Sequence, residues 1–486
     1  MRQSKVIILL ATAAWVFSLP CSAQIRAGAA ISVITPALGK TPVYLAGFGH
    51  DRIASAVHDP LSARCLALEV RGKTVVFCST DLIGLFYEDV LKIRRNVQAR
   101  SPAGSQLVVA CTHTHEGPDT LGLWGPSSKE SGVDPRYLEW VEERITATAV
   151  DAIHTLQPAR LELARDDHPL LAQLQSVDRP PYMKDPHLFV MRVVATGDAR
   201  TIATLVNWSD HPETMNRKNT VITADYPNWL RRYLEQRYGG IALFFNGAVG
   251  KLSTLGNQVA LLDPGTGRVA EDGAWRKPEL LGTLLGQLAE KALLHAEAIF
   301  PDSLTFKSSE IFIPLANDRF RIAEGAGLFG DRRPLYTSGK PDSSNHKVTL
   351  EGGQSALAAN GHDLQTEVDY ITLKSGNTVI AEFVTIPGEI FPELVNGGIS
   401  RYAGADFPDA PFEMPVRSVL KSKYQFLLGL GNDELGYLIP KAEWDEHAPW
   451  LQNSPEPYYG EINSAGPDTA ALVLRVLADL IETQER

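Results

Sequence analysis

The sequence predicts an α/β protein in which mixed β-sheets are flanked by helices, folded as a single large domain of the size of a catalytic domain. Strand-like and helix-like segments alternate along the chain, an order that favours α/β over all-α or all-β architecture. The composition is that of a globular protein, with 44% hydrophobic and 21% charged residues among 486,. No internal repeat or low-complexity linker divides the chain, and its length suffices for a large core.

The chain begins with the pattern of a secretory signal peptide. Positively charged residues precede an apolar run, and small residues then lead to a cleavage site after Ala23. The apolar run is too short to cross a bilayer. Cys21 raises a lipoprotein alternative, but Pro20 directly before it fits a lipidation site poorly. We therefore expect residues 1–23 to be removed and residues 24–486 to be exported to the periplasm or the extracellular space.

The charge pattern excludes several classes of partner. The net charge is −11 and basic residues do not cluster, which argues against nucleic acid and against electrostatic docking on anionic membranes. No later apolar run approaches transmembrane length. An apolar lipid substrate stays compatible with this composition.

Apolar runs bounded by turn residues predict the strands, and longer segments with helical periodicity predict the helices. Strands are expected at 63–70, 74–78, 106–111, 189–194, 201–208, 241–245, 308–314, 370–373, 378–385 and 424–430. Helices are expected at 87–99, 135–156, 226–238, 277–298, 391–402 and 468–485, the last capped by Asp468 and Thr469. Residues 257–275 and 319–363 are expected to be long loops or lids, and loops of this length are functional or mobile.

Three cysteines remain after the predicted cleavage. Cys65, Cys78 and Cys111 lie in strand-like runs, and each is expected to act as a small core residue,. The first two predicted strands form a hairpin, and pairing Val70 with Lys73 places Cys65 opposite Cys78, within disulfide reach. Export permits that bond, so a disulfide is the alternative to two free core thiols.

The most informative segment is Cys111-Thr112-His113-Thr114-His115-Glu116-Gly117-Pro118, at the exit of the predicted strand 106–111. Residues i and i+2 of a strand point to the same side, so His113 and His115 can face one cavity. Imidazole is the commonest protein metal ligand. Two interpretations follow: a metal site, or a pair of loop histidines bonded to water or backbone.

Two further strand exits carry ligand chemistry. His211 stands where the predicted strand 201–208 ends, and Glu389 follows the predicted strand 378–385. Each has an ordinary explanation, as a loop histidine and as a carboxylate that complements the dipole of the next helix. Active sites of α/β proteins gather at strand ends, so together with His113 these residues form a candidate His-His-Glu zinc set.

Hydroxyl groups in later segments add candidates. Tyr437 and the pair Tyr458-Tyr459 can ligate a metal or donate to an oxyanion, with packing as the alternative. Ser253 lies in Gly250-Lys251-Leu252-Ser253-Thr254. That run is not a phosphate loop, because Leu252 separates the lysine from the hydroxyl residues, and no Gly-x-Ser-x-Gly elbow surrounds the serine.

Taken in order, these segments resemble the neutral ceramidase family, the neutral or alkaline non-lysosomal ceramidases. The resemblance extends over residues 47–49, 58–64, 79–82, 112–118, 207–212, 387–389, 436–437 and 459–467. It implies an α/β catalytic domain with zinc in a deep pocket, and the implied ligands are His113, His211, Glu389 and Tyr437. It further implies a reacting centre lined by His115, Arg179 and Tyr459, or the adjacent Tyr458, with Ser253 at the position of a serine proposed as nucleophile.

The resemblance implies an exported zinc-dependent amidohydrolase that cleaves ceramide or a similar N-acyl lipid to a fatty acid and a sphingoid base or amine. Water activated at the zinc would attack the carbonyl, with Arg179 and Tyr459 as oxyanion donors and His115 as proton carrier. The sequence departs from the family pattern in three places. Ser253 lacks the flanking Asp and Pro, Glu116 replaces a serine, and no immunoglobulin-like C-terminal domain is expected. Hydrolysis of another amide, ester or lactone, and a non-catalytic binding protein, are therefore the alternatives.

Overall fold

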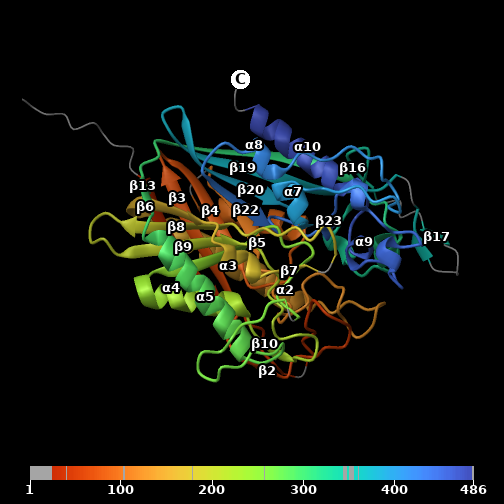
Figure 1. Ribbon diagram of the computed structural model, residues 1–486. Helices are drawn as coiled ribbons and strands as arrows, with labels where there is room; N and C mark the ends of the chain where they lie inside the picture. The colour runs from red at the N-terminus through yellow and green to blue at the C-terminus, as the bar shows by residue number, and fades with distance from the viewer. Residues whose placement is uncertain are drawn as a thin grey trace, which may run out of the picture.

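A computed structural model describes residues 25–483, except 40, 102–103, 178, 257, 343–346, 350–354 and 359–360. The expected signal peptide, residues 1–23, lies outside the described residues. Two β-sheets pack face to face, and helices cover the outer face of each (Figure 1). This arrangement confirms the predicted α/β class of mixed sheets flanked by helices. No helix among the described residues is long and apolar enough to cross a membrane.

The larger sheet has nine strands, ordered β11-β9-β8-β6-β1-β3-β4-β5 with β13 beside β6. Neighbours are antiparallel except β4 with β5 and β9 with β11, which are parallel. The strands are β1 (Ile25–Val33), β3 (Ser62–Val70), β4 (Lys73–Thr80), β5 (Gln106–Cys111), β6 (Gln157–Asp166), β8 (Leu188–Ala195), β9 (Thr201–Trp208), β11 (Ile241–Asn246) and β13 (Glu297–Ile299).

The larger sheet curls strongly, so that strands from its opposite ends meet. Ser79 on β4 donates its hydroxyl to the carbonyl of Phe244 on β11 at 2.5 Å. Arg64 on β3 donates to the carbonyl of Ala242, also on β11, at 2.9 Å. Right-handed twist accumulated over many strands produces this closure. The ends of β5, β9 and β11 are thereby brought to one region of the molecule.

The second sheet contains β14 (Ser303–Pro314), β15 (Leu335–Thr337), β16 (Lys340–Pro341), β19 (Asp363–Ser375), β20 (Thr378–Ile386) and β22 (Tyr424–Gly429). Its inner face packs against the larger sheet, with the ring centroids of Phe77 and Phe383 4.9 Å apart. The strands β20 and β22 run parallel. Their carboxyl ends therefore lie at the same edge of this sheet.

Helices complete the outer layers. Helices α1 (Tyr87–Arg100) and α2 (Pro135–His154) pack on β3, β4 and β5, whereas α4 (Tyr226–Tyr238) and α5 (Arg276–Leu293) pack on β8, β9 and β11. Helix α10 (Thr469–Glu482) covers the outer face of the second sheet and is drawn in blue at the top of Figure 1.

Short elements connect these layers. They are β2 (Ala56–Val57), β7 (Ser176–Val177), β10 (Val221–Ile222), β12 (Leu252–Ser253), β17 (Lys347–Thr349), β18 (Ser355–Leu357), β21 (Glu389–Ile390), β23 (Tyr437–Leu438), α3 (Pro169–Gln173), α6 (Asp318–Ala326), α7 (Pro392–Asn396), α8 (Val416–Val419), α9 (Tyr459–Ile462) and the 3-10 turns η1 (Gly330–Arg332), η2 (Lys441–Glu443) and η3 (Leu451–Asn453). Several of them carry candidate site residues.

Each predicted strand overlaps an observed one, but three segments correct the prediction. Residues 319–363 are not a bare loop, because they contain most of α6, whose Phe320 packs in the core. The helix expected at 391–402 is only α7, which ends at Gly397, where φ is +86°,. Helix α10 begins at Thr469, directly after the predicted cap residue Asp468, yet the Asp468 side chain makes no cap and instead pairs with Lys441.

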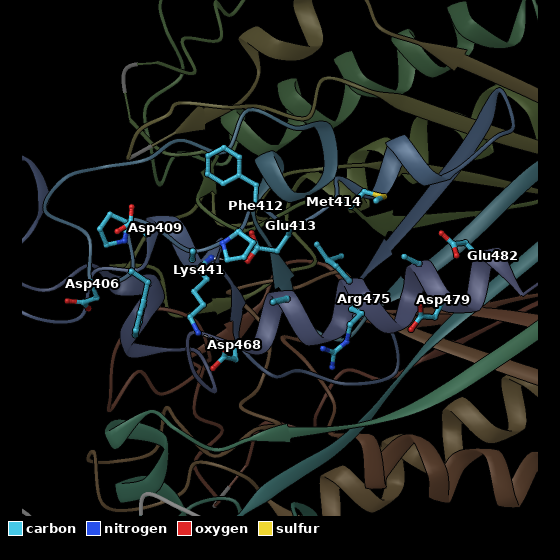
Figure 2. Close-up of a pocket in the computed structure, with 17 residues that line it drawn as sticks. Asp406, Asp409, Phe412, Glu413, Met414, Lys441, Asp468, Arg475, Asp479 and Glu482 are labelled. Carbon is cyan, nitrogen blue, oxygen red and sulfur yellow. Dashed lines mark hydrogen bonds and ion pairs between the residues drawn. The ribbon is translucent and has the colours of Figure 1, made fainter.

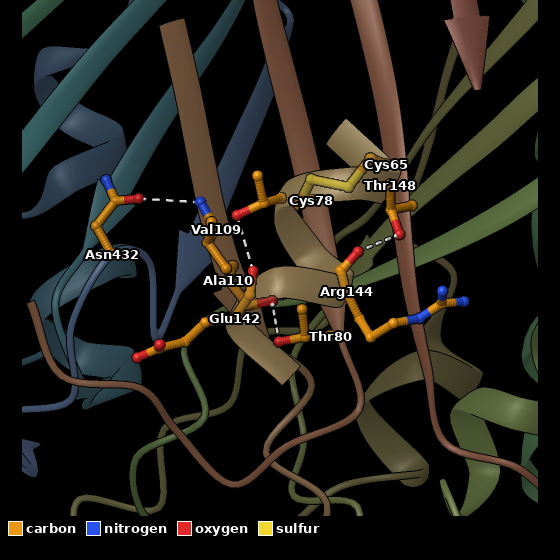
Figure 3. The surroundings of a disulfide bond; sticks show 10 residues. Cys65, Cys78, Thr80, Val109, Ala110, Glu142, Arg144, Thr148 and Asn432 are labelled. Carbon is orange, nitrogen blue, oxygen red and sulfur yellow. Dashed lines mark hydrogen bonds between the residues drawn. A yellow bond between two sulfur atoms is a disulfide. The ribbon is translucent and has the colours of Figure 1, made fainter. Parts of the chain in front are cut away.

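The Cys65–Cys78 alternative is confirmed. Strands β3 and β4 pair with Val70 opposite Lys73 and Cys65 opposite Cys78, and the two sulfur atoms form a disulfide (Figure 3). Cys111 is free and buried in the same core. Burial raises the pKa of the Cys111 thiol to about 12, so this thiol is unreactive in the folded protein.

We expect one reactive thiol per unfolded chain of residues 24–486 without reductant and three after reduction. The disulfide holds two of the three cysteines, and unfolding exposes Cys111. Thiol titration with a chromogenic reagent in denaturant gives both numbers. Equal numbers before and after reduction would rule out the bond.

Candidate metal and catalytic site

Hydrogen bonds of one asparagine join the segments that follow β5 and β9. Asn246, the last residue of β11, donates from Nδ2 to the carbonyls of Thr112 at 3.1 Å and Asp210 at 2.8 Å. Its Oδ1 accepts from the backbone N–H of Asp210 at 3.0 Å. Thr112 and Asp210 directly precede His113 and His211. The two histidines predicted at separate strand exits are therefore held side by side.

A second asparagine attaches the end of β22 to β5. The backbone N–H of Val109 donates to Asn432 Oδ1 at 3.0 Å, and Asn432 Nδ2 donates to Glu367 at 2.9 Å and to Asp369 at 2.6 Å. The segment from Asn432 leads directly to β23, where Tyr437 pairs with Glu389 of β21 in a parallel bridge. This contact brings the second sheet's candidate ligands to the histidines of the first sheet.

Three buried imidazoles form a triangle at this junction. The ring centroids of His113, His115 and His211 lie 5.0 to 5.2 Å apart. One ligand nitrogen from each lies within 4.8 Å of the others. The backbone of His113 has φ of +68°, a left-handed conformation that a non-glycine residue holds only under constraint,. Such a buried histidine cluster can bind a metal ion.

The protonation pattern of the cluster fits a cation at its centre. His113 Nδ1 lies 2.6 Å from the carbonyl of Ile83, and His211 Nδ1 lies 2.5 Å from the carbonyl of Leu252. A carbonyl only accepts, so each Nδ1 carries a hydrogen, and each Nε2 offers a lone pair when its ring is neutral. Both Nε2 atoms face Glu389 Oε2, at 3.5 and 3.0 Å. A metal cation, or a proton on Nε2, can join each of these nitrogens to the carboxylate.

The pKa shifts within the cluster reflect the attraction between Glu389 and the two histidines. Burial alone would raise the pKa of Glu389, but His113 and His211 outweigh it and hold that pKa well below its usual range. Burial alone would lower the pKa of His211, but the hydrogen bond and charge of Glu389 raise it to about 9. Burial and the other two imidazoles hold the pKa of His115 well below normal, so this ring is neutral.

Two tyrosines border the cluster on the side of the second sheet. Burial and the charge of Glu389 raise the pKa of the Tyr437 phenol well above its usual value. The rings of Tyr437 and Tyr459 meet edge to face with centroids 5.9 Å apart. Tyr459 lines the cavity over the cluster, whereas the Tyr458 hydroxyl donates to the carbonyl of Leu451 outside it. Of the two adjacent tyrosines, Tyr459 is the one placed at the site.

Ser253 lies behind the cluster rather than facing it. Its hydroxyl donates to Glu213 Oε1 at 2.5 Å, and Glu213 Oε2 lies 3.5 Å from His115 Nδ1. The serine thus orients a carboxylate that contacts His115. Glu213 was missed by the sequence analysis, although it repeats the i, i+2 spacing after His211 that singled out His115 after His113.

Arg179 is placed one layer away from the cluster. Both of its Nη1 contacts go to the Glu461 carboxylate at 2.8 Å, and Nη2 donates to the carbonyl of Glu443 at 2.9 Å. Its guanidinium carbon lies 4.2 Å from the Tyr458 ring centroid. Arg179 is not among the described residues that line the cavity over the histidines. The structure therefore brings Arg179 to α9, the helix that begins at Tyr459, and not to the imidazoles.

The cluster opens into a narrow, largely apolar cavity. Its lining comprises Gly47, Ile83, Phe86, His113, His115, Leu121, Leu123, Trp124, Phe320, Phe329, Arg333, Glu389, Glu434, Gly436, Tyr437, Tyr459 and Asn463. Leu123, Trp124, Tyr459 and Asn463 also line an outer pocket of about 730 Å³. The two spaces therefore lie side by side, on the path that a ligand with an apolar chain would take outward from the cluster.

A separate groove lies beside α10 (Figure 2). Phe412 and Met414 border it from one side, and Asp479 and Glu482 of α10 border it from the other. None of the site residues predicted from the sequence is among its described lining residues. The histidine cavity is therefore the candidate site.

No family model matches the chain, and no curated protein does either. Solved structures of ceramidases are similar to the chain in fold. A ceramidase complexed with C2 superposes with a TM-score of 0.68 at 16% identity, covering 95% of this chain and 75% of the ceramidase chain. The neutral ceramidase from Pseudomonas aeruginosa gives a TM-score of 0.64 at 17% identity, covering 95% and 74%. The chain thus has the fold of the neutral ceramidases, as the resemblance implied.

Proposed function

We propose that this chain is an exported zinc-dependent amidohydrolase that cleaves the N-acyl amide bond of ceramide or a similar N-acyl lipid. The observation that carries the proposal is the convergence of His113, His211 and Glu389 with His115 at a largely apolar cavity that shares a wall with a larger outer pocket. The ceramidase fold supports the same assignment. Hydrolysis of another amide, an ester or a lactone is the alternative at the same site.

His113, His211, Glu389 and Tyr437 would hold the ion. Zinc there supplies Lewis acidity and lowers the pKa of water toward neutrality. His115 is neutral, so it can take the proton from the attacking water and give it to the leaving nitrogen,. In the overall reaction the water oxygen joins the acyl carbon, the C–N bond breaks and the amine gains the proton.

The remaining predicted residues assist from the sides. Tyr459 lines the cavity and is our candidate donor to the developing oxyanion, a role worth roughly 3–4 kcal/mol in the barrier,. Arg179 holds Glu461 of α9 and thereby positions the helix that starts with Tyr459. Ser253 orients Glu213 against His115. We assign Ser253 and Arg179 positioning roles instead of direct contact with the substrate.

The test is release of fatty acid from a fluorescent N-acyl sphingosine by the purified protein, with and without chelator and with zinc added back. We expect turnover that the chelator removes and zinc restores. Turnover that ignores the chelator would contradict the metal role. Bound zinc of about one per chain without turnover would keep the site and move the search to other amides and esters.

Gly47 provides a prediction about the position of His115. An added Cβ at Gly47 would lie 2.3 Å from His115 Cγ, far inside van der Waals contact, and φ is +98°. We expect Gly47→Ala to displace the imidazole and to lower kcat by about 100-fold, the lower range for a lost acid–base group. The matched control is Gly72→Ala, which also has positive φ, +77°, but open space around its Cβ. Equal kcat values for the two variants would contradict the predicted collision.

A further inference from the structure

A buried arginine shares the cavity with the candidate metal site. Arg333 directly follows η1 and is 6% exposed. It lines the cavity together with His113, Glu389 and Tyr437. Charged side chains are almost never buried unless they are paired. The pairing of Arg333 is therefore informative about what the cavity binds.

One edge of the Arg333 guanidinium is open. Nη1 donates to the carbonyl of Glu434 at 2.8 Å. Nε and Nη2 are buried and have no hydrogen-bond partner in the part of the chain that the structure describes. These two nitrogens share one edge of the guanidinium, and that edge binds a carboxylate through two parallel hydrogen bonds. The open edge thus has the donor geometry of a carboxylate site.

The orientation of this edge is fixed before any ligand arrives. The guanidinium carbon lies 4.5 Å from the ring centroid of Phe86 and 5.8 Å from that of Phe329, while the Glu434 carbonyl holds Nη1. Both rings line the same cavity. Such preorganisation removes much of the ordering cost of binding, and the apolar walls strengthen a charge-assisted hydrogen bond.

Nearby carboxyl groups leave the charge available. Glu324, Asp433 and Glu434 lie close enough to interact electrostatically with Arg333, but none of them forms an ion pair with it within the described residues. Burial raises the pKa of all three, that of Glu324 to about 7. The open edge of Arg333 is therefore available to an anion from outside the protein.

We propose that Arg333 binds a carboxylate of the substrate, so that the preferred substrate is an N-acyl compound carrying a carboxylate and not a neutral ceramide. This inference rests on the proposed amide hydrolysis and narrows its substrate class. Arg333 is the one lysine or arginine among the described residues that line the inner cavity, which fits a planar monoanion better than a phosphate. The carboxylate belongs to the amine part, as in an N-acyl amino acid, or to the acyl part, as in a monoamide of a dicarboxylic acid.

The first experiment measures binding and does not depend on turnover. N-dodecanoylglycine and its neutral counterpart N-dodecanoylglycinamide are titrated into the metal-loaded protein by calorimetry. We expect the carboxylate to bind at least about 10-fold more tightly, because a bidentate charged pair is worth more than a neutral contact. Arg333→Met should remove this preference, and Arg333→Lys should restore only part of it. The matched control, Arg332→Met, alters the neighbouring arginine, which does not line the inner cavity, and should keep the preference.

The possible outcomes separate the two proposals. If the wild-type protein binds both probes equally, or if Arg333→Met keeps the preference, the carboxylate site is wrong even where ceramide is cleaved. If the preference depends on Arg333 but no amide is hydrolysed, the carboxylate site stands and the proposed function fails. Hydrolysis of the N-acylglycine, compared with that of a dicarboxylic monoamide, then shows on which side of the scissile bond the carboxylate lies. If Arg333→Met binds neither probe, Arg333→Lys becomes the deciding variant. An unchanged preference for the carboxylate probe in Arg333→Lys would overturn the bidentate assignment.

Discussion

Replacement of His113 by alanine is expected to abolish zinc binding and amide hydrolysis together. His113 supplies one of the Nε2 atoms that converge on Glu389 Oε2, and its own Nδ1 is held by the carbonyl of Ile83. Substitutions that only disturb the partners of metal ligands cost about 10–100-fold in affinity or activity. Removing a ligand should exceed that range. Elemental analysis and the fatty-acid release assay measure the two losses on one preparation.

The informative comparison is His115→Gln. The three imidazoles lie close enough to act together as ligands, so the geometry offers His115 as an alternative to Glu389 and Tyr437. If His115 moves protons, the variant should retain about one zinc per chain and lose about 10²–10⁴-fold in kcat. Loss of zinc in His115→Gln would place His115 among the ligands and contradict the assignment made above.

A surface histidine provides the control for both variants. His154 is exposed at the last turn of α2, away from the strand ends. His154→Ala should keep both zinc content and turnover. Full activity and full zinc content in His113→Ala, measured beside this control, would refute the metal site itself.

The sequence could predict the convergence of these candidate ligands because each one follows an apolar strand. His113, His211 and Glu389 all stand at such exits, and strand ends are where α/β proteins assemble sites. The Cys65–Cys78 bond was predictable for a similar reason, since a hairpin register follows from one residue pair,. Local pattern and local register indicated both features, although each kept an ordinary alternative, loop histidines in one case and free core thiols in the other.

Other parts of the site depend on contacts that no local pattern contains. The sequence analysis expected Arg333 in a long loop, and its place in the cavity depends on the packing of Phe86 and Phe329. The Arg179 side chain is oriented by a hydrogen bond to Glu461, which lies 282 residues later in the sequence. The curl of the larger sheet is likewise a tertiary property, and it decides which strand exits meet.

The second large effect is expected in stability, at an ion pair beneath the site. Arg231 of α4 donates from Nη1 and Nη2 to the two oxygens of Asp81, at 2.7 and 2.9 Å, with side-chain exposures of 1% and 0%. Asp81 also accepts from the backbone and hydroxyl of Ser62, at 2.8 and 2.9 Å. Arg231→Met would leave this carboxylate buried and unpaired. We expect a loss of about 3–5 kcal/mol in the free energy of unfolding, measured by urea denaturation.

Two further variants separate burial of charge from loss of packing. Arg237→Met removes an arginine from the same helix whose side chain is 56% exposed and pairs with Glu290, and it should leave the free energy of unfolding nearly unchanged, because exposed ion pairs contribute little. The double variant Asp81→Asn/Arg231→Met leaves no unpaired charge. It should therefore recover part of the free energy of unfolding that Arg231→Met loses, so the effects of the two substitutions should not be additive. If Arg231→Met were no worse than Arg237→Met, Asp81 would be satisfied by Ser62 alone. Thr112 directly precedes His113, and its hydroxyl lies 3.4 Å from Asp81, so it links this ion pair to the proposed metal site. We therefore expect the affinity for zinc to fall in Arg231→Met and to stay unchanged in Arg237→Met.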